Sequence, residues 1–478
     1  MLKIEEIKQL MDADYSSERK SKARVGDNYY NAIHDIRNYR IFYYDAEGDL
    51  VEDKMRSNIK ISHPFFTELV DQCVQYMLSS TEPYVRSDNP DLQDELNKYF
   101  NDEFTNELVD TGVDCKSKGF GYMYAYKSKE NRTKFLHAQA MGVIEVRETE
   151  TDDNCKYVIY HYSDSVGIKK TKITRIQVWD DTAVYYYKQE ENGSIIKDED
   201  VSINPRPHVL YKKDKDDAYY YESLGYIPFF KLRNNRNETS DLLPIKSLID
   251  DYDLMACGLS NNITDFDFPI YAVSGFQGDN LDELVQNLRT KKVVGTEAGG
   301  GIDTKTIDIP YQARICKLEL DEKNIYRFGM GFNSAQLGDG NITNVVIKSR
   351  YALLDLKCNK FEKQLRAFLR QLVLIALNEI NKINHTDYDI KDVYFKFERE
   401  VMTNASDNAS IKKVEADTRM VEINTLMNIA SQFDKETIIE LICEQLDINY
   451  NDIKDKLPKS DMELIKETED LLNGVTNE

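Results

Sequence analysis

The sequence predicts an α+β fold, in which a β-rich region is flanked by helices along the chain. Three observations support this class. Apolar residues recur every three or four positions in several long segments, as in amphipathic helices. Between residues 120 and 231 the period falls to two, as in half-buried strands. Late in the chain, a loop rich in Gly and Asn is followed by a very long segment of helical periodicity.

Helical periodicity dominates the first 115 residues. One amphipathic helix is predicted over residues 16–38 and another over residues 91–115. Between them, Pro64 suits the first position of a helix, and apolar residues recur behind it at helical spacing. The segment from Asp45 to Gly48 has the composition of a turn. This part of the chain should therefore consist of helices with short connections.

The middle of the chain changes to strand periodicity. Phe120, Tyr122 and Tyr124 alternate with smaller residues. Asn192-Gly193 is a strong hairpin signal, because both residues tolerate positive φ. Strands are predicted over residues 143–147, 157–162, 173–180, 184–189, 209–211 and 227–231. Because helices are predicted on both sides of this region, the α+β class fits better than an all-β class.

A helix is predicted to begin at Pro244 and to end near Phe266, since apolar residues keep spacings of three and four throughout. Residues 267–310 form a small α/β insert, with strands over 270–274, 293–294 and 304–309 and a helix that ends near residue 290. Asn280 is the expected N-cap of that helix, and Glu283 is placed to reach back to it. The run Gly299, Gly300 and Gly301 is predicted to form a turn.

The late part of the chain is mostly helical. A helix over residues 311–332 is followed by the loop 333–344 and by a helix over about 345–380, which would span roughly 54 Å at 1.5 Å per residue. A strand is predicted over residues 388–400, because Val393, Phe395 and Phe397 alternate. From residue 404 the chain is acidic and helical, with Asp434 as an expected N-cap.

Composition limits the class of protein. The chain has 478 residues, a formal charge of −22 and 41% hydrophobic residues, which describes an acidic globular protein. Tight binding of nucleic acid depends on Lys and Arg, so an acidic chain is poorly suited to hold DNA firmly. Seven scattered cysteines without CxxC favour free thiols in a reducing compartment. The N-terminus has no signal-peptide pattern, and no apolar run approaches the roughly 20 residues of a membrane span.

Motifs for enzyme chemistry are missing from the sequence. GxxxxGK[ST], HExxH and GxSxG do not occur, and the six histidines lack metal-ligand spacing. The three glycines at 299–301 are not followed by a helix that could face a phosphate. We therefore expect no catalytic residue, no metal and no cofactor.

Two polar groups of residues remain as candidates for function. The acidic residues near the helix 244–266 fit a solvated helix face, a metal site or the wall of a passage for DNA; they are Asp250, Asp251, Asp253, Asp265 and Asp267. The loop 333–344 fits either an ordinary helix connection or a mobile loop that projects into a channel. Its uncharged hydrogen-bonding side chains could touch phosphates without sequence preference.

Five segments, in this order along the chain, resemble the portal proteins of long-tailed bacteriophages. They are Tyr29 to Ile36, Asn58 to Asp71, Ile227 to Asp253, Ile325 to Met330 and Phe433 to Thr437. The run Ile245-Lys246-Ser247-Leu248-Ile249-Asp250-Asp251-Tyr252-Asp253 is the most specific of these matches, and it resembles the start of the family's first stem helix. The order and spacing of the five segments extend the resemblance over most of the chain.

The resemblance implies a portal-type subunit with an α/β wing, a two-helix stem, a small α/β clip, a long helix after a tunnel loop, and a helical crown. The implied regions are the wing (1–240, with strand 388–400), stem helix one (241–266), the clip (267–310), stem helix two (311–332), the tunnel loop (333–344), the long helix (345–381) and the crown (404–478). The DNA-facing residues would be Asn333, Ser334, Gln336, Gly338, Asp339, Gly340, Asn341, Thr343 and Asn344. Tunnel-wall candidates are Asp250, Asp251, Asp253 and Asp265, and clip contacts are Asn280, Glu283, Asn287, Gly299, Gly300 and Gly301.

The resemblance also implies a function and partners. The chain would form a ring of about twelve copies at one capsid vertex, a conduit for packaging and ejection of double-stranded DNA without sequence specificity. Its partners would be the terminase large subunit, a head–tail adaptor, and the major capsid and scaffold proteins, with no membrane. It would be assembled in the host bacterial cytoplasm and reside in the virion. The alternatives are an intracellular scaffold or adaptor without a DNA role, and a metal-dependent virion enzyme that processes DNA.

Overall fold

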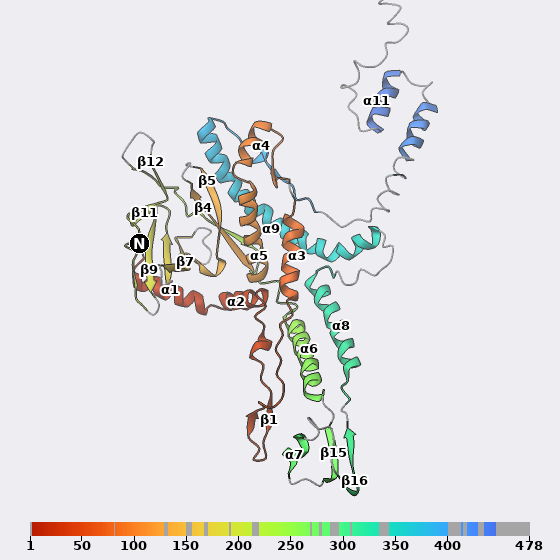
Figure 1. Cartoon of the computed structure of the whole chain (residues 1–478). Coiled ribbons are helices and arrows are strands. Elements are labelled where there is room, and N and C mark those ends of the chain that lie inside the picture. Colours follow the sequence, from red (N-terminus) through yellow and green to blue (C-terminus); the bar gives the residue numbers. More distant parts are fainter. Residues whose placement is uncertain are drawn as a thin grey trace, which may run out of the picture. The chain divides into compact units, whose positions relative to one another are not determined.

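The computed structural model describes residues 2–80, 82–128, 132–149, 155–166, 171–190, 193–212, 219–267, 270–276, 280–286, 296–305, 308–333, 344–399, 413, 418–428 and 435–445 (Figure 1). The chain divides into two compact units, residues 1–337 with 350–400 and residues 338–349 with 401–478. Helices and small sheets are mixed in the first unit, which confirms the α+β class.

The N-terminal helices differ from the prediction at both ends. Helix α1 spans Ile4–Ser16 and was not predicted. Helix α2 spans Glu18–Tyr30, so it begins later and ends earlier than the helix predicted over residues 16–38. Ser17 separates them because its backbone is extended and its hydroxyl accepts the N–H of Lys20, as an N-cap does. The short 3₁₀ helix η1 (Asp35–Asn38) covers the end of the predicted segment.

A hairpin of β1 (Phe42–Tyr44) and β2 (Leu50–Glu52) follows, and the predicted turn at 45–48 joins its strands. Helix α3 (Phe65–Leu78) begins one residue later than predicted, with Pro64 as its N-cap, and buries Phe66, Leu69, Cys73 and Met77. The predicted helix 91–115 is in fact two helices, α4 (Pro90–Asn97) and α5 (Asp102–Lys118). They separate at Asn101, whose side chain accepts the N–H of Phe104 and so starts a new helix.

The strands of the first unit form two main antiparallel sheets. Strand β4 (Phe120–Lys127) lies between β14 (Phe229–Arg233) and β5 (Thr133–Ala138). Strand β5 was not predicted. The larger sheet contains β6 (Val143–Val146), β7 (Tyr157–Val166), β8 (Thr171–Trp179), β9 (Ala183–Glu190), β10 (Ile195–Lys197) and β11 (Arg206–Pro207). A separate pair consists of β12 (Val209–Lys212) and β13 (Tyr219–Glu222). Phe120, Tyr122, Val158 and Trp179 belong to the core shared by the two main sheets.

Helix α6 (Lys246–Phe266) packs along helix α8 (Tyr311–Gly329), and the insert between them holds β15 (Ile270–Phe276), α7 (Leu281–Gln286) and β16 (Thr296–Lys305) (Figure 1). The predicted glycine turn is wrong, because Gly299, Gly300 and Gly301 lie within β16. Gly301 pairs with Ser274, and a Cβ on Gly300 would lie 2.5 Å from the Ser274 carbonyl oxygen. Gly300 therefore permits close strand approach, and Gly299, with φ +93°, lies where the pairing shifts register between Ser274 and Phe276. The predicted strand 293–294 lies outside the described residues.

Helix α9 spans Asn344–Asn384, which confirms the long helix. The predicted strand 388–400 is reduced to β17 (Tyr394–Phe395), since its partner β3 (Val85–Arg86) is equally short, and the 3₁₀ helix η5 (Ile390–Asp392) precedes it. In the acidic C-terminal part, α11 spans Lys435–Gln445 and residues 418–428 are helical. Asp434 and most of the remainder lie outside the described residues.

Gly119 is a position at which only glycine fits. It ends α5 with φ +95°, and a Cβ there would lie 2.2 Å from the backbone oxygen of Glu238. We predict that Gly119→Ala lowers the free energy of unfolding by about 3 kcal/mol or more, through backbone strain and this clash. Gly48→Ala is the matched control, since Gly48 has φ +87° with nothing within 4 Å, and should cost only about 1 kcal/mol. Equal losses in denaturant titrations would contradict this account.

Candidate functional site

An extended segment, residues 57–63, runs antiparallel along α6, and we call it the strap. Side chains four residues apart on α6 accept hydrogen bonds from alternate backbone N–H groups of the strap. The pairs are Asp253 with His63 (3.0 Å), Cys257 with Ile61 (3.2 Å), Asn261 with Ile59 (2.7 Å) and Asp265 with Ser57 (2.9 Å). Four residues of helix advance about 6.0 Å and two residues of extended chain about 6.6 Å, so the two repeats stay in register.

Asp253 is the most buried member of this set. Its carboxylate contacts the ring Nδ1 of His34 at 2.6 Å and of His63 at 2.7 Å, and His34 stacks on Tyr29. Burial alone would raise the pKa of Asp253, but the hydrogen bonds from both histidines and from the His63 backbone outweigh it and lower the pKa. The prediction that Asp253 lies on a solvated face or a tunnel wall is therefore wrong, because this side chain is 0% exposed.

The other acidic candidates of α6 also have partners within the chain. Asp250 accepts the hydroxyl of Tyr29 and pairs with Lys246 at 2.8 Å. Asp251 pairs with Lys317 of α8 at 2.5 Å. Asp265 lies 3.9 Å from Arg56 besides its bond to the strap. Each of these three carboxylates thus has a cation beside it; whether any of them faces a passage for DNA stays a prediction.

The end of α8 and the start of the following loop are fixed by α3 and α9. Gln72 of α3 holds both backbone polar groups of Phe332: its side-chain oxygen accepts the N–H (3.0 Å) and its side-chain nitrogen donates to the carbonyl (2.8 Å). The Phe332 ring stacks on Tyr351, with centroids 4.5 Å apart. Asn333 donates to Glu322 at 2.8 Å. The chain therefore enters the loop from a defined position.

Of the other residues predicted for this loop, Asn344 is the first residue of α9. The rest lie outside the described residues, namely Ser334, Gln336, Gly338, Asp339, Gly340, Asn341 and Thr343. Their predicted contact with DNA is untested.

A buried ionic cluster lies beneath this loop entry. Lys357 of α9 donates to the carbonyl of Gly329, in the last turn of α8, at 3.0 Å and pairs with Asp241 at 3.0 Å. Lys116 of α5 lies 3.4 Å from the same carboxylate and donates to Asn234 at 2.9 Å. Burial would raise the pKa of Asp241, yet the charges of Lys116 and Lys357 lower it. This cluster joins the ends of α5 and α8 to α9.

The predicted clip contacts are only partly described. The backbone carbonyl of Asn280 accepts the N–H of Leu284, which is consistent with a cap position at the start of α7. Glu283 lies in α7, and Asn287 lies outside the described residues. The three glycines lie in β16, as given above.

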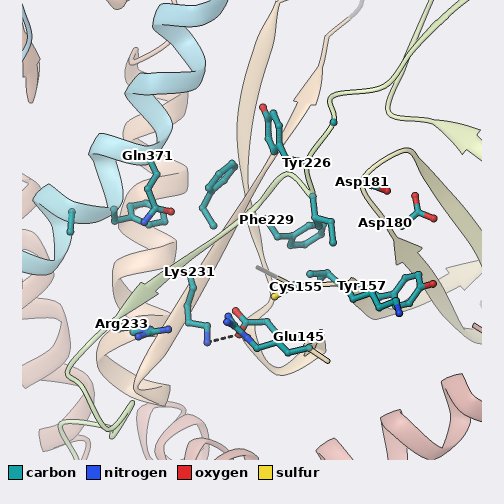
Figure 2. A pocket seen from close by; sticks show the side chains of 18 of the residues that line it. Glu145, Cys155, Tyr157, Asp180, Asp181, Tyr226, Phe229, Lys231, Arg233 and Gln371 are labelled. Carbon is teal, nitrogen blue, oxygen red and sulfur yellow. Dashed lines mark hydrogen bonds and ion pairs between the residues drawn. The ribbon is translucent and has the colours of Figure 1, made fainter. Parts of the chain in front are cut away.

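A cavity of about 960 Å³ lies between β14, the sheet edge at residues 145–158 and α9. Figure 2 shows Lys231 and Arg233 on one side of it and Asp180 and Asp181 on the other. Lys231 pairs with Glu145 at 2.7 Å. Burial favours a raised pKa for Glu145, but Lys231 and Arg147 lower it. Burial raises the pKa of the Cys155 thiol, which does not favour a nucleophile. This lining indicates a structural gap between elements rather than a reaction site.

Within the described ranges, one group of three carboxylates lies close enough to share a cation, namely Asp45, Glu47 and Asp49 on the exposed hairpin turn. Asp45 already accepts the N–H groups of Glu47 (3.0 Å) and Asp49 (2.9 Å). These hydrogen bonds stabilise the turn and account for the closeness of the three carboxylates.

Sequence reasoning missed the strap, the Gln72 contacts and the buried lysines. One signal was available, because Asp253, Cys257, Asn261 and Asp265 recur every four residues and so lie along one side of α6. A stripe of hydrogen-bonding residues at this spacing indicates a partner along the helix. Gln72 and Lys357 carry no comparable pattern.

Loss of the Asp253 carboxylate should loosen the strap. We predict that Asp253→Asn lowers the free energy of unfolding by about 2–4 kcal/mol at pH 7, because the buried His34 and the partly buried His63 lose a charged acceptor. Asp267→Asn, at the exposed end of the same helix, is the control and should change it by less than about 0.5 kcal/mol.

The loss of stability caused by Asp253→Asn should become smaller as the pH falls. The folded-state pKa of Asp253 lies below its ordinary 3.8, so its contribution is complete above that value and is lost as the pH falls through the folded pKa. The difference between wild type and Asp253→Asn should therefore shrink below about pH 3.8. A difference that grows on acidification would contradict the assignment.

Comparison with known proteins agrees with the resemblance. The family model described as phage portal protein, SPP1 Gp6-like, matches residues 13–452. The chain is 28% identical over 386 residues to the portal protein of Bacillus phage SPP1, covering 80% of this chain and 75% of that protein. It is 25% identical over 431 residues to the portal protein of Clostridium phage phiCD119, covering 86% and 89%.

No helix in the described part of the chain is long and apolar enough to cross a membrane. The family model, in contrast, extends over nearly the whole chain, from the N-terminal helices to the acidic C-terminal part. The chain therefore belongs to the SPP1 Gp6-like family of phage portal proteins.

Proposed function

We propose that this chain is the structural subunit of a phage portal, a ring at one capsid vertex through which viral DNA is packaged and ejected. The family match over residues 13–452 carries the proposal. Portal proteins are structural components of the virion, form oligomeric rings at the capsid vertex and serve DNA packaging. A scaffold or adaptor without a DNA role, and a metal-dependent enzyme, are both less consistent with this family.

We assign the regions as follows. The wing is 1–240 with 388–400, the stem is 241–266 and 311–332, the clip is 267–310, the tunnel loop is 333–344, the long helix is 345–381 and the crown is 404–478. The antiparallel pair α6 and α8, with the small insert between them, supports the stem and clip assignments. The loop entry at Phe332 and the 41-residue helix α9 support the next two.

The assigned clip would dock the terminase large subunit during packaging and the head–tail adaptor afterwards. The ring would hold about twelve copies and would assemble with major capsid and scaffold proteins in the host bacterial cytoplasm. DNA would pass through without sequence-specific contacts, because the tunnel loop is mostly uncharged and each subunit carries −22 formal charges. No cofactor takes part in this function.

Ring formation is the direct test. We predict that purified wild-type chain, concentrated or supplied with its scaffold protein, forms closed rings with a central hole of about 20 Å or more in electron microscopy, the width of a duplex. Light scattering would give the ring mass and hence the subunit number. A chain that stays monomeric or dimeric under both conditions would argue against a portal and for the scaffold or adaptor alternative.

The anchored loop entry gives a second test. We predict that Gln72→Ala leaves rings intact but reduces DNA packaging several-fold, because the backbone groups of Phe332 lose both partners and the loop entry loosens. Gln75→Ala is the matched control, since Gln75 is exposed on the same helix and should package normally. Packaging is measured as DNase-protected DNA. Unchanged packaging in Gln72→Ala would show that the Gln72 contacts at the loop entry are not needed for DNA passage.

A further inference from the structure

The β1–β2 hairpin exposes apolar side chains on both of its faces. The antiparallel register places Phe42, Tyr44 and Leu50 on one face and Tyr43 and Val51 on the other. On the first face these side chains are 49%, 74% and 59% exposed, respectively. An isolated two-stranded hairpin is marginally stable in water, and contiguous exposed apolar residues mark interaction sites. The described residues leave this face uncovered, as expected of a surface that binds a partner.

A second exposed surface lies on the outer side of α8. Leu320 is 54% exposed there, and the exposed Cys316 lies one turn before it on the same side. The inner side of α8 is already occupied by α6, through Lys317 and Arg314. The outer side of α8 therefore also lacks a partner within the described chain.

The two surfaces lie on different sides of the same stem helix. The strap, which continues from the hairpin, contacts α6 at Asp253, whereas α8 contacts α6 at Asp251. Residues two apart on a helix point about 160° apart around its axis, and one turn further on Cys257 faces the strap while Gly258 faces Arg314 of α8, about 100° apart. The strap and α8 therefore contact different sides of α6. Figure 1 shows β1 and α8 on the two flanks of α6. Two different surfaces on opposite flanks are what a head-to-tail interface requires, and repetition of such an interface by rotation closes a ring.

Charge also favours contact between these two surfaces. The hairpin turn carries Asp45, Glu47 and Asp49, and the outer side of α8 carries the exposed cations Lys323 and Arg327 and one exposed carboxylate, Glu319. Opposite charges at the edge of an apolar contact orient two partners and exclude wrong registers.

We propose that the hairpin of one subunit packs its Phe42–Tyr44–Leu50 face against the outer side of α8 in the neighbouring subunit of the ring. The partner is a second copy of this chain. This inference rests on the proposed portal function and adds to it the residues that join adjacent subunits.

Cross-linking tests the contact directly, because Cys316 is a native probe on α8. We expect a chain with Tyr44→Cys, assembled into rings and treated with a short bismaleimide, to give a series of covalent multimers in denaturing gels. The matched control, Tyr44→Cys with Cys316→Ser, should lose the series. Peptide mass spectrometry should join position 44 to Cys316. Links within one chain only, links to another element, or no links in assembled rings would overturn the inference.

Assembly gives an independent measurement. We expect Tyr44→Ser with Leu50→Ser to reduce the ring fraction at least tenfold in mass photometry, with an unchanged circular dichroism spectrum, because both side chains are exposed in the single chain. Tyr15→Ser with Ile196→Ser is the matched control, as these residues are exposed elsewhere, and it should form rings normally. Normal rings from the hairpin variant would overturn this inference and leave the portal function standing. Absence of rings in the wild type would overturn both.

Discussion

The pairing of the strap with α6 is the constraint on which much of the first unit depends. An extended segment cannot satisfy its own backbone, and buried N–H groups without partners are costly. Here α6 supplies four acceptors from one stripe of side chains, so the segment between the hairpin and α3 is fixed along the helix. This sets where the hairpin lies at one end of the strap. At the other end it sets where Pro64 begins α3, which in turn holds the loop entry through Gln72.

The buried cluster around Asp241 fixes the other end of the α6–α8 pair, where α8 meets α9. Two lysines in a dry environment are unfavourable unless a carboxylate and further acceptors surround them. Asn234 and Asp241, in the connection between β14 and α6, and the carbonyl of Gly329, at the end of α8, provide these acceptors. A shift of α8 relative to α9 would break a bond to a buried charge. The end of the stem helix is therefore tied to the long helix, with the loop between them.

The sequence predicted the elements that periodicity alone determines. Helices α3, α6 and α9 follow from long apolar stripes, and the larger sheet follows from its alternating strands. The breaks at Ser17 and Asn101 were missed, because the apolar pattern continues across both caps. The glycines of β16 were misread as a turn, since Gly300 serves a close approach to Ser274, a contact distant in sequence. Asp253 was misplaced for a related reason: a carboxylate on a helix normally faces water, and only tertiary partners such as His34 and His63 make its burial favourable.

The negative charge along α6 depends on the cations that lie beside its carboxylates as well as on the number of carboxylates. Asp250, Asp251 and Asp265 each have a cation nearby, but Lys246 also pairs with Asp35 and Lys317 also pairs with Asp321, so the cations cancel only part of the negative charge along α6. Most of the 84 Asp and Glu residues behind the formal charge of −22 lie elsewhere in the chain. Repulsion between such groups and DNA phosphates acts over roughly 8–10 Å at moderate salt. In the proposed portal, weak contact with DNA would follow from two separate properties, an acidic subunit that offers phosphate few cations and a loop over residues 333–344 of mostly uncharged hydrogen-bonding residues. Asp253, one of the carboxylates that first suggested a tunnel wall, instead holds the strap against α6 through His63 and contacts the buried His34, while a tunnel-facing role for Asp250, Asp251 and Asp265 stays a prediction.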